Sequence, residues 1–196
     1  MSLLLESIKV EQGHICNLEY HQARVTRSSR AIFNMDGIDL NEIFRLNECP
    51  ENGTYKCRLI YDQQLRSIEY LPYVKRTIAQ SLMVDAFDFT YPHKYLDRTF
   101  FDDLKIRFPQ FDEIILYKDG LITDSCFSNL AFYDGTSWFT PENPLLPGTK
   151  RQQLLDQGKI QLAKININDL QQFQQVSFIN AMLNLGESSL PITSII

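Results

Sequence analysis

The sequence lacks the features of a membrane protein, a disulfide scaffold or a metal site. No run approaches 18 consecutive apolar residues, and the leucines at positions 3–5 lead directly into Glu6, so neither a membrane span nor a secretory signal is expected. The four cysteines form no CxxC pair and the three histidines lie far apart, so we expect free thiols and no zinc site. These absences predict a soluble, cytoplasmic protein without a bound metal.

An excess of positive charge is also missing. The 196 residues carry 24 acidic and 19 basic side chains, which gives a net charge of −5. We therefore expect no binding to nucleic acid or to an acidic membrane. HExxH, the P-loop, GxGxxG and GxSxG are absent as well, so zinc hydrolysis, P-loop phosphoryl transfer, common dinucleotide oxidoreduction and serine hydrolysis are not first choices.

The composition is that of a globular protein with its own core. Hydrophobic residues make up 44% of the chain and aromatic residues 12%, and a chain of this length buries roughly 70% of its unfolded surface. Short β-branched runs on both sides of the turn EQGH predict an opening hairpin. Apolar positions at helical spacing predict a helix over 18–33, and a second, shorter helix is predicted over 40–46 with Asn41 near its start as a cap.

Alternation of side chains predicts strands after these helices. In TYKCRLIY, residues 54–61, Lys56 and Arg58 share one face because side chains alternate across a strand. The run over 65–73 is expected to pair back, and Pro72 suggests that it ends at an edge of the sheet. Residues 74–91 are a candidate crossover. The rest predicts a meander of the strands EIILYK, SNLAFY, SWFT and VSFI, with helices over 97–107, from Thr149 and at INDLQQF.

Taken one at a time, the polar residues are ordinary. His21, on the apolar stripe of the first helix, is typical of a packed or capping residue. Lys94 suits an exposed helix start, and Asp124 suits a turn or strand end. Arg58 fits a solvated strand face, and the Gly148–Thr149 pair fits a plain surface cap.

In their order and context, however, these residues resemble the fold-type IV pyridoxal-phosphate enzymes, the class IV aminotransferases. The resemblance is carried by Arg58, by Lys94 in PHKYLDR, by Asp124 in GLITDSCFSNLAF and by the segment FTPENPLLPGTKRQ. It extends from ESIKVEQGHI and LEYHQARV to VSFINAMLNLGESSLPITSI, nearly the whole chain. The most specific part is the element G-x-[IV]-T-[ED]-x-x-x-x-N-[LF]-x-F, followed by TP and L-x-G-x-x-R.

The resemblance implies an α/β (α+β) fold in two parts. A small α+β N-terminal domain is expected over residues 1–80, and a β-rich pseudo-barrel domain that carries the cofactor lysine over 81–196. Pyridoxal 5′-phosphate would lie in the cleft between them. The family pattern also implies a homodimer.

The family pattern assigns a role to each candidate residue. Lys94 is the expected catalytic residue, because a Schiff-base lysine must have an amine that can be neutral near pH 7. Asp124 would face the pyridine nitrogen and keep it protonated; the family usually has glutamate there, so its reach is shorter by one methylene. Arg58 is expected at the cofactor phosphate because a guanidinium fork suits phosphate. The backbone N–H groups of Gly148 and Thr149, at a helix start, would hold the same phosphate. The roles of Ser128 and Asn129 stay open.

The reaction is less defined than the cofactor. KYLDR and FINAML are similar to segments of aminodeoxychorismate lyase, which implies conversion of aminodeoxychorismate to p-aminobenzoate and pyruvate in folate biosynthesis. An aminotransferase acting on branched-chain or D-amino acids is the alternative, and a non-catalytic relative that binds a phosphate ligand or a partner is a third hypothesis.

The chain is shorter than typical members before Lys94, where the substrate-carboxylate arginine would lie. Lys75 and Arg76 are candidates for its replacement, although a solvated charge pair is their plainer interpretation.

Overall fold

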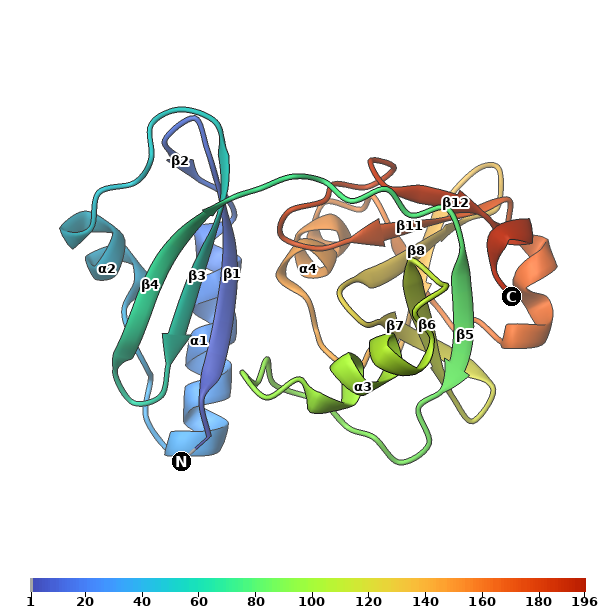
Figure 1. The fold of residues 1–196 in the computed structure, drawn as a ribbon, viewed down its shortest axis with the longest axis horizontal. Helices are drawn as coiled ribbons and strands as arrows, with labels where there is room; N and C mark the ends of the chain where they lie inside the picture. Colours follow the sequence, from blue (N-terminus) through green and yellow to red (C-terminus); the bar gives the residue numbers. More distant parts are fainter. Residues whose placement is uncertain (1) are drawn as a thin grey trace. The chain divides into compact units, whose positions relative to one another are not determined.

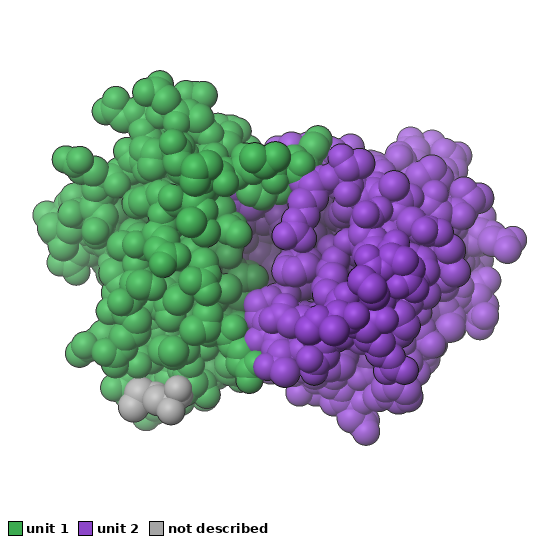
Figure 2. All heavy atoms as spheres, viewed as in Figure 1, with its two compact units in different colours: residues 1–75, 93–97 green, residues 76–92, 98–196 purple. Residues whose placement is uncertain are grey.

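The computed structural model describes residues 2–196, which form two compact units (Figure 1). Unit 1 comprises the chain up to Lys75 together with the segment His93–Asp97. Unit 2 comprises Arg76–Pro92 and Arg98–Ile196. Figure 2 shows the atoms of unit 1 in green and those of unit 2 in purple. The segment that contains Lys94 is therefore part of unit 1, and the expected domain boundary near residue 80 stays a prediction.

Unit 1 is an antiparallel sheet of order β2-β1-β3-β4 with α1 packed against one face (Figure 1). Leu4, Ile8 and Val10 alternate on the inner face of β1 and share a core with Val25 of α1. The predicted hairpin, both helices and the edge position of the strand that ends at Pro72 are confirmed. The elements are β1 (Leu4–Glu11), β2 (His14–Ile15), α1 (Leu18–Phe33), α2 (Leu40–Leu46), β3 (Thr54–Tyr61) and β4 (Leu65–Pro72).

The predicted cap of α2 was wrong by two residues. Asp39, not Asn41, caps this helix: its Oδ1 accepts the N–H of Asn41 at 2.8 Å and that of Glu42 at 3.3 Å. A capping side chain must precede the first helical turn to reach the N–H groups that lack an intrahelical partner. Asn41 already lies inside the turn.

Unit 2 contains a three-stranded sheet of order β5-β6-β7 and a five-stranded sheet of order β10-β9-β8-β11-β12. A shared core joins Ile115 and Ile122 of the first sheet to Phe132 and Phe178 of the second. The elements are β5 (Ser81–Asp85), α3 (Thr99–Arg107), β6 (Glu113–Lys118), β7 (Leu121–Ser125), β8 (Asn129–Tyr133), β9 (Trp138–Pro141), α4 (Thr149–Asp156), β10 (Gln161–Ala163), the 3₁₀ helices η1 (Ile167–Gln172) and η2 (Ile192–Ser194), β11 (Gln175–Ile179) and β12 (Ser189–Pro191).

Four strands of unit 2 were not expected from the sequence: β5, β7, β10 and β12. β5 lies within the stretch interpreted as a crossover, and it pairs in parallel with β6. β7 contains Asp124, which therefore lies on a strand paired with β6 rather than in a turn. INDLQQF forms the 3₁₀ helix η1. Within the described residues 2–196, no helix is long and apolar enough to cross a membrane.

Candidate active site

Asp124 is the best-defined polar group of unit 2. Asp124 lies on β7 and is only 5% exposed, and each of its carboxylate oxygens accepts a hydrogen bond. Oδ1 accepts from Nδ2 of Asn129 at 2.6 Å, and Oδ2 accepts from the N–H of Leu146 at 2.8 Å. Burial raises the pKa of Asp124 to about 7; the two hydrogen bonds and the charge of Arg151 oppose this rise only in part.

The start of α4 lies beside this carboxylate. Gly148 is the N-cap residue in an extended conformation, and Thr149 begins the helix as a buried residue. A Cβ atom on Gly148 would stand 1.9 Å from Oδ1 of Asn129. Glycine is therefore needed here for the close approach of the Asn129 side chain, a reason that the sequence alone did not reveal.

The helix start can also hold an anion. Within residues 2–196, no side chain caps α4 at Gly148, and its first turn has no acidic residue. A helix of this kind presents N–H groups and the positive end of its dipole to an anionic group. Arg151 of the L-x-G-x-x-R element is buried and donates to the carbonyl of Pro141 at 2.8 Å, so it anchors α4 to β9.

Lys94 lies in a short extended segment that is held to the edge of β1. Its carbonyl accepts the N–H of Leu5 at 2.9 Å, and the N–H of Leu96 donates to the carbonyl of Leu3 at 2.9 Å. The preceding residue, His93, contacts Ser28 of α1, with Nδ1 and Oγ 3.0 Å apart. The backbone around the partly buried Lys94 is thus fixed by both the sheet and the helix of unit 1.

A buried charge cluster lies near Lys94. Arg24 donates to both carboxylate oxygens of Glu6, at 2.8 and 2.6 Å, and Nδ1 of His21 is 2.6 Å from Oε2. Burial would raise the pKa of Glu6, but the charge of Arg24 and the hydrogen bonds from His21 and Arg24 lower it to about 2. Burial lowers the pKa of His21. The hydrogen bond and charge of Glu6 raise this pKa, whereas the charges of Arg24 and Lys94 lower it further. Lys94 is therefore within electrostatic range of the cluster.

Sequence reasoning missed this cluster. His21 is packed, as one interpretation had it, but it contacts a carboxylate and does not cap the helix. The available signal was the placement of charge at inward positions: Glu6 alternates with Leu4 and Ile8 on the core face of β1, and Arg24 adjoins Val25 on the inner side of α1. Opposite charges at two core-facing positions predict a buried pair.

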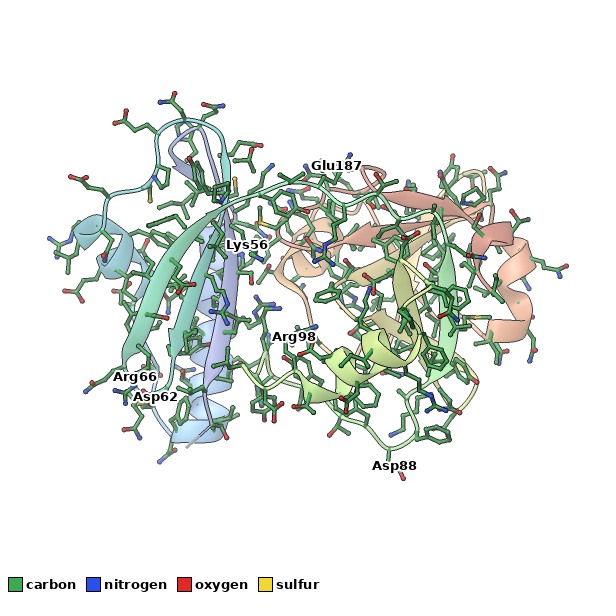
Figure 3. The ribbon with its side chains drawn as sticks, in the orientation of Figure 1. Lys56, Asp62, Arg66, Asp88, Arg98 and Glu187 are labelled. Carbon is green, nitrogen blue, oxygen red and sulfur yellow. The ribbon has the colours of Figure 1, made fainter. Side chains whose placement is uncertain are left out.

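Arg58 lies on the outer face of the unit 1 sheet. It stands opposite Ser7 of β1 and shares its face with Lys56, labelled in Figure 3, as the alternation of β3 predicts. Its Nη1 atom is 3.6 Å from Oε2 of Glu69 on β4, and its side chain is 30% exposed. The structure thus places Arg58 and Lys94 in unit 1, and it brings Asp124, Gly148 and Thr149 together in unit 2.

The fold and these sites agree with a family of known enzymes. Residues 3–195 match the model of the family Amino-transferase class IV, so the chain belongs to the class IV aminotransferases, whose fold is that of pyridoxal-phosphate-dependent enzymes. The predicted family and the predicted α+β fold are confirmed. An uncharacterized protein of Haemophilus influenzae is 35% identical over 185 residues, which cover 93% of this chain and 98% of that protein.

Two solved structures have a similar fold. A protein of Haemophilus somnus, provisionally named as a 4-amino-4-deoxychorismate lyase, superposes with a TM-score of 0.87 and 32% identity, covering 94% of this chain and 98% of its own. A hypothetical aminotransferase of Mycobacterium tuberculosis in its PLP-bound form gives a TM-score of 0.79 at 18% identity, covering 99% and 81%. The second likeness is one of fold alone.

The residues of unit 2 fit the cofactor of this family. The start of α4 suits a phosphate. Asp124 is a buried carboxylate whose raised pKa shows that its charge is incompletely compensated, and a protonated ring nitrogen beside it would lower that pKa. The predicted cofactor, pyridoxal 5′-phosphate, is confirmed at the level of the family. Within the part of the chain that the structure describes, no three His, Cys, Asp or Glu side chains form a metal-binding group.

Proposed function

We propose that this protein is a pyridoxal-phosphate-dependent lyase that converts aminodeoxychorismate to p-aminobenzoate and pyruvate. The observation that carries the cofactor site is the buried Asp124, clamped by Asn129 and Leu146 beside the start of α4. The choice of a lyase is supported by the similarity to the Haemophilus somnus protein across 94% of the chain. It is also supported by the segments KYLDR and FINAML.

Lys94 has two tasks in this proposal. Lys94 holds the aldehyde end of the cofactor through Nζ, and the same amine acts as the general base and acid that moves a proton at the substrate. The charge of Lys94 acts on the buried cluster of Glu6, His21 and Arg24, since it lowers the pKa of His21. When bound, pyridoxal phosphate supplies the ring that accepts electrons from the bond being broken.

The remaining residues hold the two ends of the cofactor. Asp124 keeps the ring nitrogen protonated, with Asn129 fixing the orientation of the carboxylate. The N–H groups at Gly148 and Thr149 bind the phosphate, and Arg58 contributes a guanidinium group to it.

The wider context belongs to the same proposal. The protein acts in the cytoplasm as a homodimer of two-domain subunits, divided into residues 1–80 and 81–196. Its partner is a small-molecule substrate, aminodeoxychorismate or an amino acid, and it binds neither nucleic acid nor membrane. Its product enters folate biosynthesis.

The first experiment tests the covalent site. Protein mixed with pyridoxal phosphate is expected to turn yellow and to lose that colour on borohydride reduction, and peptide mass spectrometry should then locate the added mass on Lys94. The Lys94→Ala variant should form no adduct at this site, whereas Lys159→Ala, which changes an exposed lysine after α4, should behave as wild type. A colourless wild-type protein would support the non-catalytic hypothesis instead.

The second experiment tests the reaction. The loaded enzyme is supplied with aminodeoxychorismate, and p-aminobenzoate is measured by its fluorescence and pyruvate by a coupled assay. Equal amounts of both products are expected. If the enzyme instead forms keto acids from branched-chain or D-amino acids and releases no p-aminobenzoate, it is an aminotransferase and the lyase proposal is wrong.

A further inference from the structure

An exposed aromatic ring with several cations around it lies between β7 and β8. Phe127 is 43% exposed in the turn that joins these strands. The charged carbon of Arg98 is 4.9 Å from the centre of its ring and that of Arg76 is 5.8 Å away, while Nζ of Lys105 is 5.3 Å away. In a chain with a net charge of −5, three cations around one ring are a local reversal of sign.

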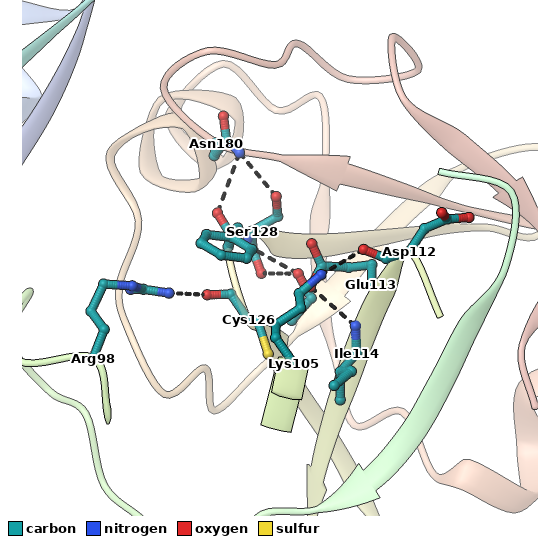
Figure 4. Close-up of polar contacts among 10 residues, drawn as sticks. Arg98, Lys105, Asp112, Glu113, Ile114, Cys126, Ser128 and Asn180 are labelled. Atoms are coloured by element: carbon teal, nitrogen blue, oxygen red, sulfur yellow. Dashed lines mark hydrogen bonds and ion pairs between the residues drawn. The ribbon is translucent and has the colours of Figure 1, made fainter. Parts of the chain in front are cut away.

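Among the described residues, the two arginines are not neutralised by ion pairs. Arg98 also lies over Phe101, 4.5 Å from its ring centre, and donates from Nη2 to the carbonyl of Cys126 at 2.6 Å (Figure 4). Within residues 2–196, no ion pair joins Arg76 or Arg98 to a carboxylate. Both guanidinium groups therefore retain donors and a full charge next to an accessible ring.

Lys105 has a different role. It donates from Nζ to the carbonyl of Asp112 at 2.5 Å and lies 3.9 Å from Oε1 of Glu113 (Figure 4). Glu113 is buried, and burial raises its pKa, with the charges of Lys105 and Arg76 and hydrogen bonds from backbone N–H groups acting in the opposite direction. Lys105 thus contacts Glu113 and the backbone of Asp112, which leaves Arg76 and Arg98, of these three cations, open to a ligand.

The ring is tied to the residues of the candidate active site. Asn180, at the end of β11, donates from Nδ2 to the carbonyl of Phe127 at 3.3 Å and to Oγ of Ser128 at 3.0 Å. The next residue along β8, Asn129, is the one that holds Asp124. Phe127, over which the two arginines lie, is therefore two residues from Asn129, which holds Asp124.

We propose that Arg76 and Arg98, stacked on Phe127, bind the ring-borne carboxylate of the substrate. A guanidinium group that lies over an aromatic face keeps its N–H edge available for a carboxylate, and the exposed ring gives a planar substrate an apolar surface. This assignment rests on the proposed lyase function, whose substrate carries a carboxylate on a six-membered ring.

The test uses the cofactor-loaded enzyme and two probes that cannot react, benzoate and its neutral analogue benzamide. Calorimetry should show that Arg76→Gln and Arg98→Gln each weaken benzoate binding about tenfold. Benzamide binding should stay unchanged, because benzamide is neutral and forms no ion pair with an arginine. Glutamine keeps an amide donor for the carbonyl of Cys126, which protects the fold. Arg107→Gln is the matched control, since the guanidinium carbon of Arg107 lies over the ring of Phe108, 5.3 Å from its centre, rather than over Phe127.

Steady-state kinetics give a second measurement. The KM for aminodeoxychorismate should rise about tenfold in both arginine variants with kcat within about twofold of wild type, since the lost contact is made in the ground state and the transition state alike. Normal p-aminobenzoate release with unchanged KM and benzoate affinity would overturn the carboxylate assignment and leave the lyase intact. Arginine-dependent benzoate binding in an enzyme that releases no p-aminobenzoate would support the carboxylate site and refute the lyase. Absence of benzoate binding to the wild type would overturn the assignment.

Discussion

The side-chain amide of Asn129 lies between Asp124 and Leu146 and joins them. Its Nδ2 atom donates to Oδ1 of Asp124 at 2.6 Å and to the carbonyl of Leu146 at 2.8 Å, while the N–H of Leu146 donates to Oδ2 of Asp124 at 2.8 Å. These bonds connect β7, β8 and the segment that leads to α4. The orientation of the Asp124 carboxylate therefore depends on the position of one amide.

Gly148→Ala is expected to disturb this arrangement. The new Cβ would lie 1.9 Å from Oδ1 of Asn129, so the amide must move and its bond to Asp124 weakens. The backbone of Gly148 suits alanine, since its φ is −75°, so the clash alone is tested. Loss of a buried hydrogen bond to a carboxylate should lower the unfolding free energy by about 1–3 kcal/mol, measured by urea denaturation, and weaken pyridoxal-phosphate binding.

A double variant provides the control for this clash. Asn129→Ala removes the atom that the new Cβ would strike, so the Gly148→Ala change should cost much less in that background than in wild type. Equal costs in both backgrounds would show that the contact between residues 129 and 148 does not limit this position.

Asp124 should make the stability of the cofactor-free protein depend on pH. Its pKa is about 7 in the folded protein and near 3.8 ordinarily, so between these values the folded state holds a proton that the unfolded chain has released. The unfolding free energy contributed by this group is thus fully present below about pH 4 and falls as the pH rises toward 7.

Asp124→Asn should remove this part of the pH dependence, even if the amide itself lowers stability at every pH. Urea unfolding of both proteins at about pH 5 and pH 8 measures the difference, and bound pyridoxal phosphate should suppress it in the wild type. Parallel pH profiles for the two cofactor-free proteins would contradict the raised pKa.

Glu6→Gln should strongly destabilise unit 1. It removes the negative charge that Arg24 contacts at both oxygens and leaves a guanidinium group buried without a carboxylate. Breaking a buried pair in this way costs about 3–5 kcal/mol. Asp36→Asn, which removes the exposed partner of Arg30 on the same helix, should change the urea midpoint little. Similar shifts for both variants would mean that burial of the Glu6 pair does not matter.

Ser28→Ala should loosen the segment that carries Lys94. The change removes the 3.0 Å contact with His93, worth about 1 kcal/mol, and the amide of Leu96 should then exchange faster with deuterium. Ser29→Ala is the matched control, because Oγ of this adjacent, buried serine has no hydrogen-bond partner within residues 2–196. Faster exchange in both variants, or in neither, would argue against a specific role of the His93 contact.

The local elements could be predicted from the sequence. The bounds of α1 and α2 follow from helical spacing, and the shared face of Lys56 and Arg58 follows from strict alternation, because both patterns depend only on neighbours along the chain. β7 escaped this reasoning because its run is short and contains polar residues at buried positions. The motif around Asp124 and the L-x-G-x-x-R element drew attention to Asp124 and Gly148, which lie close to the same asparagine, Asn129, in unit 2.

The contacts between these residues arise only in the folded chain. Asp124 takes a donor from Leu146, Gly148 makes room for Asn129, and the backbone of Lys94 is held by Leu5. The partners of Glu6 likewise come from another element, α1. Hydrogen bonds and charges act over a few ångströms in space regardless of separation along the chain, so periodicity and motif spacing carry no record of them.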